Sequence, residues 1–304
     1  MNPILQICNI FCKNKKTKFA IKFLEELSDV LIDSQQGFIL GLCFQELGEY
    51  EKAISIFEKL KDYVQDKDQV AANLAICHTN LLQIKEAYEY LELCHKFDLR
   101  IQVKQNIDRV SREMTYLGSD SGFWQNHDEN IHSYALSDFI VKTISKDRPV
   151  HDFGCGDGFY LSVLESAGFG NLTGYEGSPT AQPKFKNIQS QDLATSFDVS
   201  NKGHVICLEV AEHVPRKYEQ VFLNNITNAC DGYLIFSWAI RGQGGTCHVN
   251  CRNNDEVMDM IIEKGFRYDH ELTQLARSVI ENHCGWFQDT LLIFYTERAN
   301  SSLD

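Results

Sequence analysis

From about residue 150 onward, the chain alternates between short apolar runs and stretches with helical periodicity. Continuous apolar runs predict strands buried on both faces, whereas apolar residues three and four apart predict amphipathic helices. Their alternation predicts an α/β domain built on a mostly parallel sheet. Expected strands are 150–153, 171–176, 188–193, 204–210, 232–238, one beginning at 266–268, and an antiparallel closing strand at 289–295; expected helices are 132–144, 160–168, 217–229, 255–264 and 271–283.

The first third of the chain repeats a pattern of large and small residues. Offsets of 33 and 34 residues align Ile7, Phe11, Ala20 and Leu24 with Leu40, Phe44, Ala53 and Phe57, and these with Leu74, His78, Ala87 and Leu91. This period is typical of helix-turn-helix solenoids. In the middle copy Gly41 and Ala53 allow two helices to cross closely, and Gly48 ends the first of them.

Residues 1–100 therefore resemble tetratricopeptide repeats, in a degenerate form. The resemblance implies a concave surface for a protein or peptide partner, and a brace for the following domain is the alternative. His78 is interpreted as a substitute for an aromatic residue at the edge of the core. The breaks at 117–122 predict a linker, so we expect a helical repeat domain at 1–117 and an α/β domain at 118–304.

Composition narrows the partners and the compartment. The net charge is −13, which argues against sequence-independent binding of nucleic acid or of an anionic membrane, because phosphates require Lys and Arg. No secretory signal or membrane-spanning apolar run is present, and the 11 cysteines are scattered over expected helices and strands. We therefore expect a cytoplasmic protein with reduced thiols. Cys247 and Cys251 lack a second ligand pair at finger-like spacing, so they are not assigned to a metal.

A glycine turn follows the first expected strand. Gly154, Gly156 and Gly158 alternate, and Asp152 lies two residues ahead of them. Glycines permit a ligand to approach the backbone. A dinucleotide site would require its third glycine at the position of Phe159, and a carboxylate at Asp152 would repel phosphate but could hold an ammonium group. An ordinary glycine-rich turn is the structural alternative.

The pattern resembles motif I of class I S-adenosylmethionine-dependent methyltransferases. The resemblance implies a Rossmann-like, seven-stranded methyltransferase sheet over about residues 120–298, and a cofactor bound by Asp152, Gly154 and Gly156. Glu176 ends the second expected strand twenty residues beyond Gly156, the distance expected of a carboxylate that binds both ribose hydroxyls. Asp192 resembles the residue that accepts a hydrogen bond from the adenine amino group.

The segment 208–215 resembles the motif IV region of many methyltransferases, and Glu209 is expected at the cofactor pocket. His213 and His248 each follow an expected strand end, and imidazole is suited to remove a proton from an oxygen or nitrogen nucleophile. They are the catalytic candidates. The aromatic lead-in offers Trp124, His132 and Tyr134 as pocket walls, or as simple packing residues.

The segment around Glu209 and His213 also supports a second hypothesis, a metal-assisted reaction. Four residues resemble the metal-binding positions of small-RNA 3′-terminal 2′-O-methyltransferases: Glu209, Glu212, His213 and His248. The spacing of the two glutamates also occurs without a metal, so no metal ligand is assigned. Three functions remain: a methyltransferase with an unidentified acceptor, an RNA-terminal 2′-O-methyltransferase, and a cofactor-binding adaptor that works through its repeats.

Overall fold

The computed structural model describes residues 19, 22, 34–114, 131–178, 181 and 184–297. The chain divides into two units, residues 1–114 and 115–304, which are considered separately below as the helical unit and the α/β unit. The first expected repeat, the linker at 117–122 and Trp124 lie outside the described residues.

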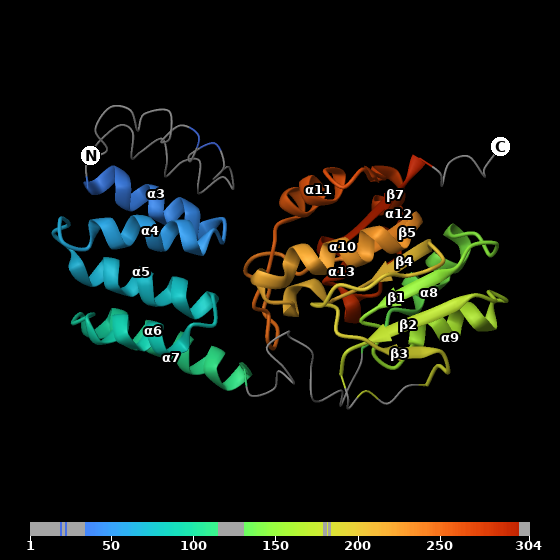
Figure 1. Cartoon of the computed structure of the whole chain (residues 1–304), viewed down its shortest axis with the longest axis horizontal. Coiled ribbons are helices and arrows are strands. Elements are labelled where there is room, and N and C mark those ends of the chain that lie inside the picture. The colour runs from blue at the N-terminus through green and yellow to red at the C-terminus, as the bar shows by residue number, and fades with distance from the viewer. Residues whose placement is uncertain are drawn as a thin grey trace. The chain divides into compact units, whose positions relative to one another are not determined.

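The described part of the helical unit consists of helices that follow one another side by side in chain order (Figure 1). Apolar residues of α3, α4 and α5 form one core, and those of α5, α6 and the first half of α7 form a second core. Helix α5 therefore buries two faces, one in each core. Their bounds are α3 Ser34–Glu46, α4 Tyr50–Leu60, α5 Lys67–Asn80, α6 Ile84–Glu92 and α7 Phe97–Met114.

Two positions explain the tight pairing of these helices. A Cβ atom on Gly41 would lie 2.5 Å from Cε1 of Phe57, so only glycine allows α3 to approach α4 this closely. Gly48 turns the chain between α3 and α4 with a φ of 68°. Leu82, which is 34 residues further on, adopts a φ of 60° between α5 and α6, so the same turn is made there at the cost of some strain.

The α/β unit is built on a seven-stranded sheet in the order β3-β2-β1-β4-β5-β7-β6. The first five strands are parallel, and β7 runs antiparallel to both β5 and β6. This confirms the expected mixed α/β class and the antiparallel closing strand. The strands are β1 Val150–Phe153, β2 Leu172–Glu176, β3 Ile188–Ser190, β4 Gly203–Cys207, β5 Cys230–Ser237, β6 Arg267–Tyr268 and β7 Leu291–Tyr295.

Helices cover both faces of this sheet (Figure 1). Val205 and Cys207 of β4 pack against α10 and α11, whereas Ile206 faces the opposite layer with α8, α9 and α12. Alternate residues of one strand thus enter two different cores, which is why the run is continuously apolar. The helices are α8 Tyr134–Thr143, α9 Phe159–Ser166, α10 Glu219–Ala229, α11 Asn254–Ile262, α12 His270–Val279 and α13 Phe287–Thr290.

Three expected strands are clearly shorter than the sequence pattern suggested, and one of them is β3, which ends at Ser190 so that Asp192 lies in the turn after it. β4 ends at Cys207, so Leu208 and Val210 belong to a turn that lines a cavity, which explains their apolar character. β7 begins at Leu291, because α13 occupies the residues before it. Among the described helices, none has the length and apolarity needed to cross a bilayer.

Candidate active site

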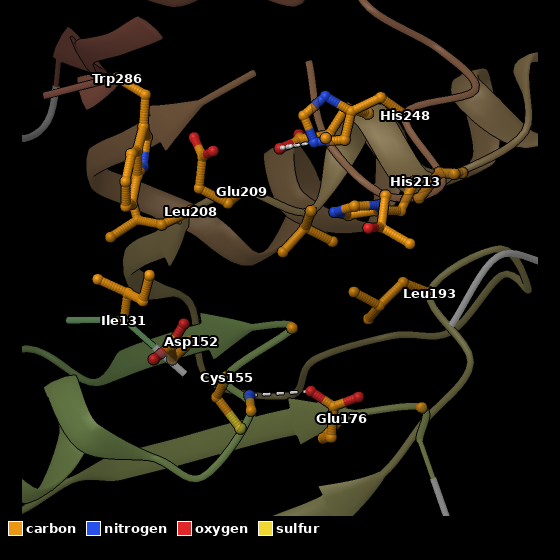
Figure 2. Close-up of a pocket in the computed structure, with 18 of the residues that line it drawn as sticks. Ile131, Asp152, Cys155, Glu176, Leu193, Leu208, Glu209, His213, His248 and Trp286 are labelled. Carbon is orange, nitrogen blue, oxygen red and sulfur yellow. Dashed lines mark hydrogen bonds and ion pairs between the residues drawn. The ribbon is translucent and has the colours of Figure 1, made fainter. Parts of the chain in front are cut away.

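A cavity of about 480 Å³ opens over the carboxyl ends of β1, β2 and β4. This is where open α/β sheets place their ligands, near the point at which the strand order reverses. Figure 2 shows Asp152, Cys155 and Glu176 on one side of it and Glu209, His213 and His248 on the other, with Trp286 beside Leu208. The cavity therefore has two chemically distinct ends, called below the β1–β2 end and the β4–β5 end.

The glycine turn follows β1 as expected, with Gly154, Gly156 and Gly158 at φ values of 75°, 55° and 80°. A Cβ on Gly154 would lie 2.4 Å from Val210, and one on Gly158 would lie 2.5 Å from Phe185. These two glycines are thus required by the left-handed backbone and by the protein's own side chains. Gly154 and Gly156 also line the cavity.

Asp152 is 3% exposed and lines the cavity from the end of β1. Its Oδ2 atom has no hydrogen-bond partner. Burial raises the pKa of Asp152 to about 8, and the negative fields of Glu176 and Asp157 add to this effect. A buried carboxyl group without a donor is unusual, because its desolvation is not offset within the protein. A cationic ligand in the cavity would offset it.

Glu176 is held by the backbone at the end of β2. The amide of Gly156 donates to Oε2 at 2.9 Å, and the amide of Ser178 donates to Oε1 at 2.8 Å. An ionised carboxylate accepts about four hydrogen bonds, so both oxygens keep acceptor capacity towards the cavity. The glycine turn after β1 and the carboxylate at the end of β2 are thus joined by the hydrogen bond between Gly156 and Glu176.

Asp192 lines the same cavity beyond β3, as expected. Its Oδ1 atom accepts a hydrogen bond of 2.9 Å from the amide of Ala194. Leu193 forms an apolar part of the wall beside it. The pair offers a carboxylate next to an apolar surface, which is suited to a flat heterocycle with an exocyclic amino group.

His132 also reaches the cavity, whereas Tyr134 is 66% exposed and only contacts Phe159 from the outside. The His132 ring stacks on Phe159, with 4.2 Å between ring centroids. Asp157, which we had not singled out, holds this wall in place. Its carboxylate accepts hydrogen bonds from the amide of Phe159 and, at 2.8 Å, from Nζ of Lys184.

At the β4–β5 end, Glu209 adopts a φ of 56°, a strained value for a residue with a side chain. Ser237 accepts a hydrogen bond of 2.7 Å from its amide and donates one of 2.9 Å to its Oε1 atom. Burial raises the pKa of Glu209 to about 6, although Ser237 and Thr290 partly stabilise the ionised form. With this backbone conformation the Glu209 side chain lines the cavity.

Glu212 is fully buried, and neither carboxylate oxygen has a partner that satisfies normal hydrogen-bond geometry. Burial and the neighbouring Glu209 raise its pKa well above the usual range. Nε2 of His248 lies 4.0 Å from its Oε1 atom. Glu212 was expected only as part of a metal set, and the structure places it between the two catalytic candidates.

The two imidazoles lie together, with 5.1 Å between ring centroids. Nδ1 of His213 lies 3.2 Å from the carbonyl oxygen of Cys247. Because a carbonyl only accepts, Nδ1 carries the proton and Nε2 keeps its lone pair in the neutral ring. Burial and the adjacent His248 lower the pKa of His213 to about 3, so this ring is neutral at physiological pH.

Buried ion pairs anchor the loop that carries His248. They were not identified from the sequence. Arg252 binds Glu219 at 2.9 Å and Glu256 at 3.2 Å, and Arg241 binds Glu256 at 2.7 Å. All of these acids and Arg252 are less than 10% exposed. No local pattern could reveal the network, because its members are spread over three separate segments.

Glycine at position 245 makes room for the His248 ring: a Cβ there would lie 2.1 Å from its Nε2 atom. A Cβ added to Gly244 would have no other heavy atom within 4 Å. The amides of Val249 and Asn250 both donate to the backbone carbonyl of Glu212 at 2.9 Å. The position of the imidazole therefore depends on Gly245 and on the anchored end of the loop.

No protein-family profile matches the sequence, and no curated protein matches it. Among solved structures, magnesium protoporphyrin IX methyltransferase from Synechocystis PCC 6803 with bound SAM is similar at 15% identity, over 56% of this chain and 88% of that chain, with a TM-score of 0.38. A sugar N-methyltransferase from Streptoalloteichus sp ATCC 53650 is similar at 13% identity, over 54% and 87%, with a TM-score of 0.41.

The methyltransferase domain of a bacterial Hen1 protein is similar at 16% identity, over 52% of this chain and 97% of that chain, with a TM-score of 0.37. Scores at this level do not establish a common family. The residues of the cavity must therefore carry the assignment of function.

Proposed function

We propose that this chain is an S-adenosylmethionine-dependent methyltransferase. One observation carries the proposal. Asp152, whose buried Oδ2 atom has no hydrogen-bond partner among the described residues, and Glu176, a carboxylate held by two amides, face one cavity on either side of a glycine turn. Such a pair suits a ligand with a cationic group at one point and a diol at another.

The residues at the β1–β2 end fit the cofactor in order. Asp152 would hold the ammonium group, Glu176 would accept from both ribose hydroxyls, and Asp192 would accept from the adenine amino group. When bound, the cofactor supplies a methyl group whose bond to sulfur breaks, with the electron pair left on sulfur, as the bond to the acceptor forms. The protein mainly has to align the nucleophile, which can account for much of the acceleration.

A dinucleotide is the obvious rival, and the cavity disfavours it. Phe159 occupies the position of the third glycine of a pyrophosphate-binding turn, and its ring is already stacked on His132. The acids that line the β1–β2 end, Asp152 and Glu176, would repel a pyrophosphate. Neither feature obstructs a nucleoside that carries positive charge.

At the β4–β5 end, His248 and His213 have different roles in this proposal. The carboxyl group of Glu212 beside His248 would stabilise an imidazolium, so Nε2 of His248 is suited to take the acceptor's proton. His213 stays neutral and presents the lone pair of Nε2, which orients the same proton. Glu209 lies at the boundary between the cofactor and the acceptor.

A metal-assisted reaction is the second candidate, and one observation favours it. Glu212, His213 and His248 each offer a ligand atom, and the three atoms lie within 4.8 Å of one another. A ligating imidazole commonly donates its other N–H to a carbonyl, as His213 does to Cys247. A divalent ion here would lower the pKa of an acceptor hydroxyl. Glu209 does not belong to this set, because its carboxylate binds Ser237.

Calorimetric titration tests the cofactor assignment. We expect S-adenosylmethionine to bind with micromolar affinity and Glu176→Ala to weaken binding about tenfold or more, because hydrogen bonds to a carboxylate contribute about 1.5–3 kcal/mol. Glu165→Ala is a matched control, since Glu165 is exposed on α9 and does not line the cavity. Equal affinities for wild type and Glu176→Ala would exclude the assignment.

A titration of metal-free protein with Mn²⁺ or Zn²⁺ separates the two reaction types. Binding that is lost in His248→Ala would support the metal-assisted reaction. If neither ion binds and methyl transfer withstands a chelator, His248 acts as the base without a metal.

For the helical unit we propose a tetratricopeptide-like module that binds a protein or peptide or braces the α/β unit. The paired helices and the matching turns at Gly48 and Leu82 support it. A groove of about 350 Å³ lies beside α3 and the start of α4, lined by Ile39, Leu42, Gln45 and Tyr50 among others. An adaptor that works through this groove is the remaining alternative.

A further inference from the structure

The charges around the cavity restrict the acceptor. Of the described residues that line it, five are carboxylic acids, three are histidines, and none is a lysine or arginine. Arg241 and Arg252, which flank the loop that carries His248, bind Glu256 and Glu219. An acceptor with a phosphate or carboxylate at the reacting end would have no cation to bind.

The polar groups at the β4–β5 end exclude a purely apolar acceptor. Both carboxylate oxygens of Glu212 and Nε1 of Trp286 are buried, and among the described residues none satisfies normal hydrogen-bond geometry with them. Each buried polar group left unsatisfied costs about 1–3 kcal/mol. The two kinds of group need opposite partners, since the Glu212 carboxyl group has at least one oxygen that requires a donor, whether or not it is ionised, and the indole N–H requires an acceptor. A hydroxyl group provides both.

An amine fits this end less well than a hydroxyl. Carboxylic acids around the reacting atom would hold an amine as its ammonium ion, which has no lone pair with which to attack. A hydroxyl group keeps its lone pairs at every physiological pH and only has to give up its proton, which the imidazole of His248 can take.

The walls of this end are flat and apolar. Trp286 and Leu208 face the cavity side by side (Figure 2), and Phe287 lies next to Trp286 with 5.7 Å between ring centroids. An indole presents an apolar face and a single polar edge. A ring that bears C–H groups on its faces and hydroxyls on its rim matches both parts of this surface.

We propose that the acceptor is an uncharged sugar unit, bound through neighbouring hydroxyls by Glu212 and Trp286 and methylated on a hydroxyl oxygen. This rests on the proposed methyl transfer. The hydroxyl oxygen forms the new bond to the methyl carbon, the methyl–sulfur electron pair stays on sulfur, and the hydroxyl proton passes to Nε2 of His248. Charge, hydrogen-bonding capacity and shape each point to this class.

Saturation-transfer NMR on the full chain tests the proposal. The protein is loaded with S-adenosylhomocysteine, after calorimetry has confirmed that this binds. The methyl α-glycosides of glucose, galactose, mannose and rhamnose are compared with glucuronic acid, glucosamine, glycerol 3-phosphate and a short RNA with a free 3′ end. We expect signal from at least one neutral glycoside and about tenfold less from every anionic compound, because no lysine or arginine is among the described residues that line the cavity.

Signal from charged compounds alone, or from none of the compounds, overturns the sugar proposal. If S-adenosylhomocysteine itself does not bind, the proposed function fails instead, so the two failures are distinguishable. Signal from the RNA without signal from any glycoside would overturn the sugar proposal in favour of a terminal 2′-hydroxyl.

Two variants locate the binding surface. Trp286→Leu and Glu212→Gln should each weaken glycoside binding about tenfold, since the first removes the indole N–H and the second replaces an acceptor oxygen with an NH2 group. Their affinity for S-adenosylhomocysteine should stay within about twofold of wild type, which also shows that the fold is intact. Glu271→Gln is the matched control on the exposed side of α12. Unchanged glycoside affinity in both cavity variants refutes the placement.

Discussion

Replacing Asp152 with asparagine tests how this buried carboxyl group affects the stability of the α/β unit, independently of ligand binding. The side chain keeps its size but can no longer ionise. In the wild type the pKa of Asp152 is raised by burial from 3.8 to about 8. Between these values the folded protein retains a proton that the unfolded chain has released. The contribution of Asp152 to stability is therefore complete below about pH 4 and is lost as the pH rises towards 8.

The size of the effect follows from this proton. One proton more in the folded state lowers the free energy of unfolding by about 1.4 kcal/mol for each unit of pH. Asp152→Asn lacks this dependence. The difference in unfolding free energy between the variant and the wild type should therefore grow by about 3 kcal/mol, in favour of the variant, between pH 5 and pH 7.

Urea unfolding followed by tryptophan fluorescence measures this difference in the full chain. The protein's three tryptophans are Trp124, Trp238 and Trp286, so the signal comes from the α/β unit. Asp138→Asn, at an exposed position on α8, is the matched control and should show no such trend. A constant difference across this pH range would mean that Asp152 is already ionised in the free protein, and the reasoning would be refuted.

Further predictions concern the loop and its anchor. Gly245→Ala should displace the His248 ring, because the new Cβ would lie 2.1 Å from its Nε2 atom, whereas Gly244→Ala should not. The imidazole resonances of His248 in a long-range ¹H–¹⁵N spectrum report this, and equal shifts in both variants would contradict it. Arg252→Met should lower the free energy of unfolding by about 3–5 kcal/mol, since it leaves the buried Glu219 without its arginine. Arg267→Met, at an exposed ion pair, should cost less than about 1 kcal/mol, and a loss of similar size in the urea titrations of both variants would contradict the role of burial.

The sequence predicted most of the sheet because a parallel strand buried on both faces leaves a continuous apolar run. The same criterion placed the end of β4 too far along the chain. Leu208 and Val210 are apolar because they line the cavity, and apolarity alone cannot separate a cavity wall from a strand. The sequence brought Asp152, Gly156 and Glu176 together as candidates because the motif residues lie close together in the chain and Glu176 ends the next strand, and all three line the cavity.

The β4–β5 end was only partly predictable. His213 and His248 were found because each follows a strand end, but the role of Glu212 depends on its burial, which no local pattern encodes. Trp286 was missed because it lies far along the chain from the motifs and enters the cavity only through the packing of α13. Arg252 would be expected at the surface from its charge, since buried arginines are rare unless paired.

The structure of a complex with S-adenosylhomocysteine would test the central claim most directly. We predict that the amino-acid portion lies beside Asp152, that both ribose hydroxyls contact Glu176 and that the adenine lies next to Asp192. A ligand located elsewhere, or a cavity that remains closed to it while NAD binds in its place, would contradict the account.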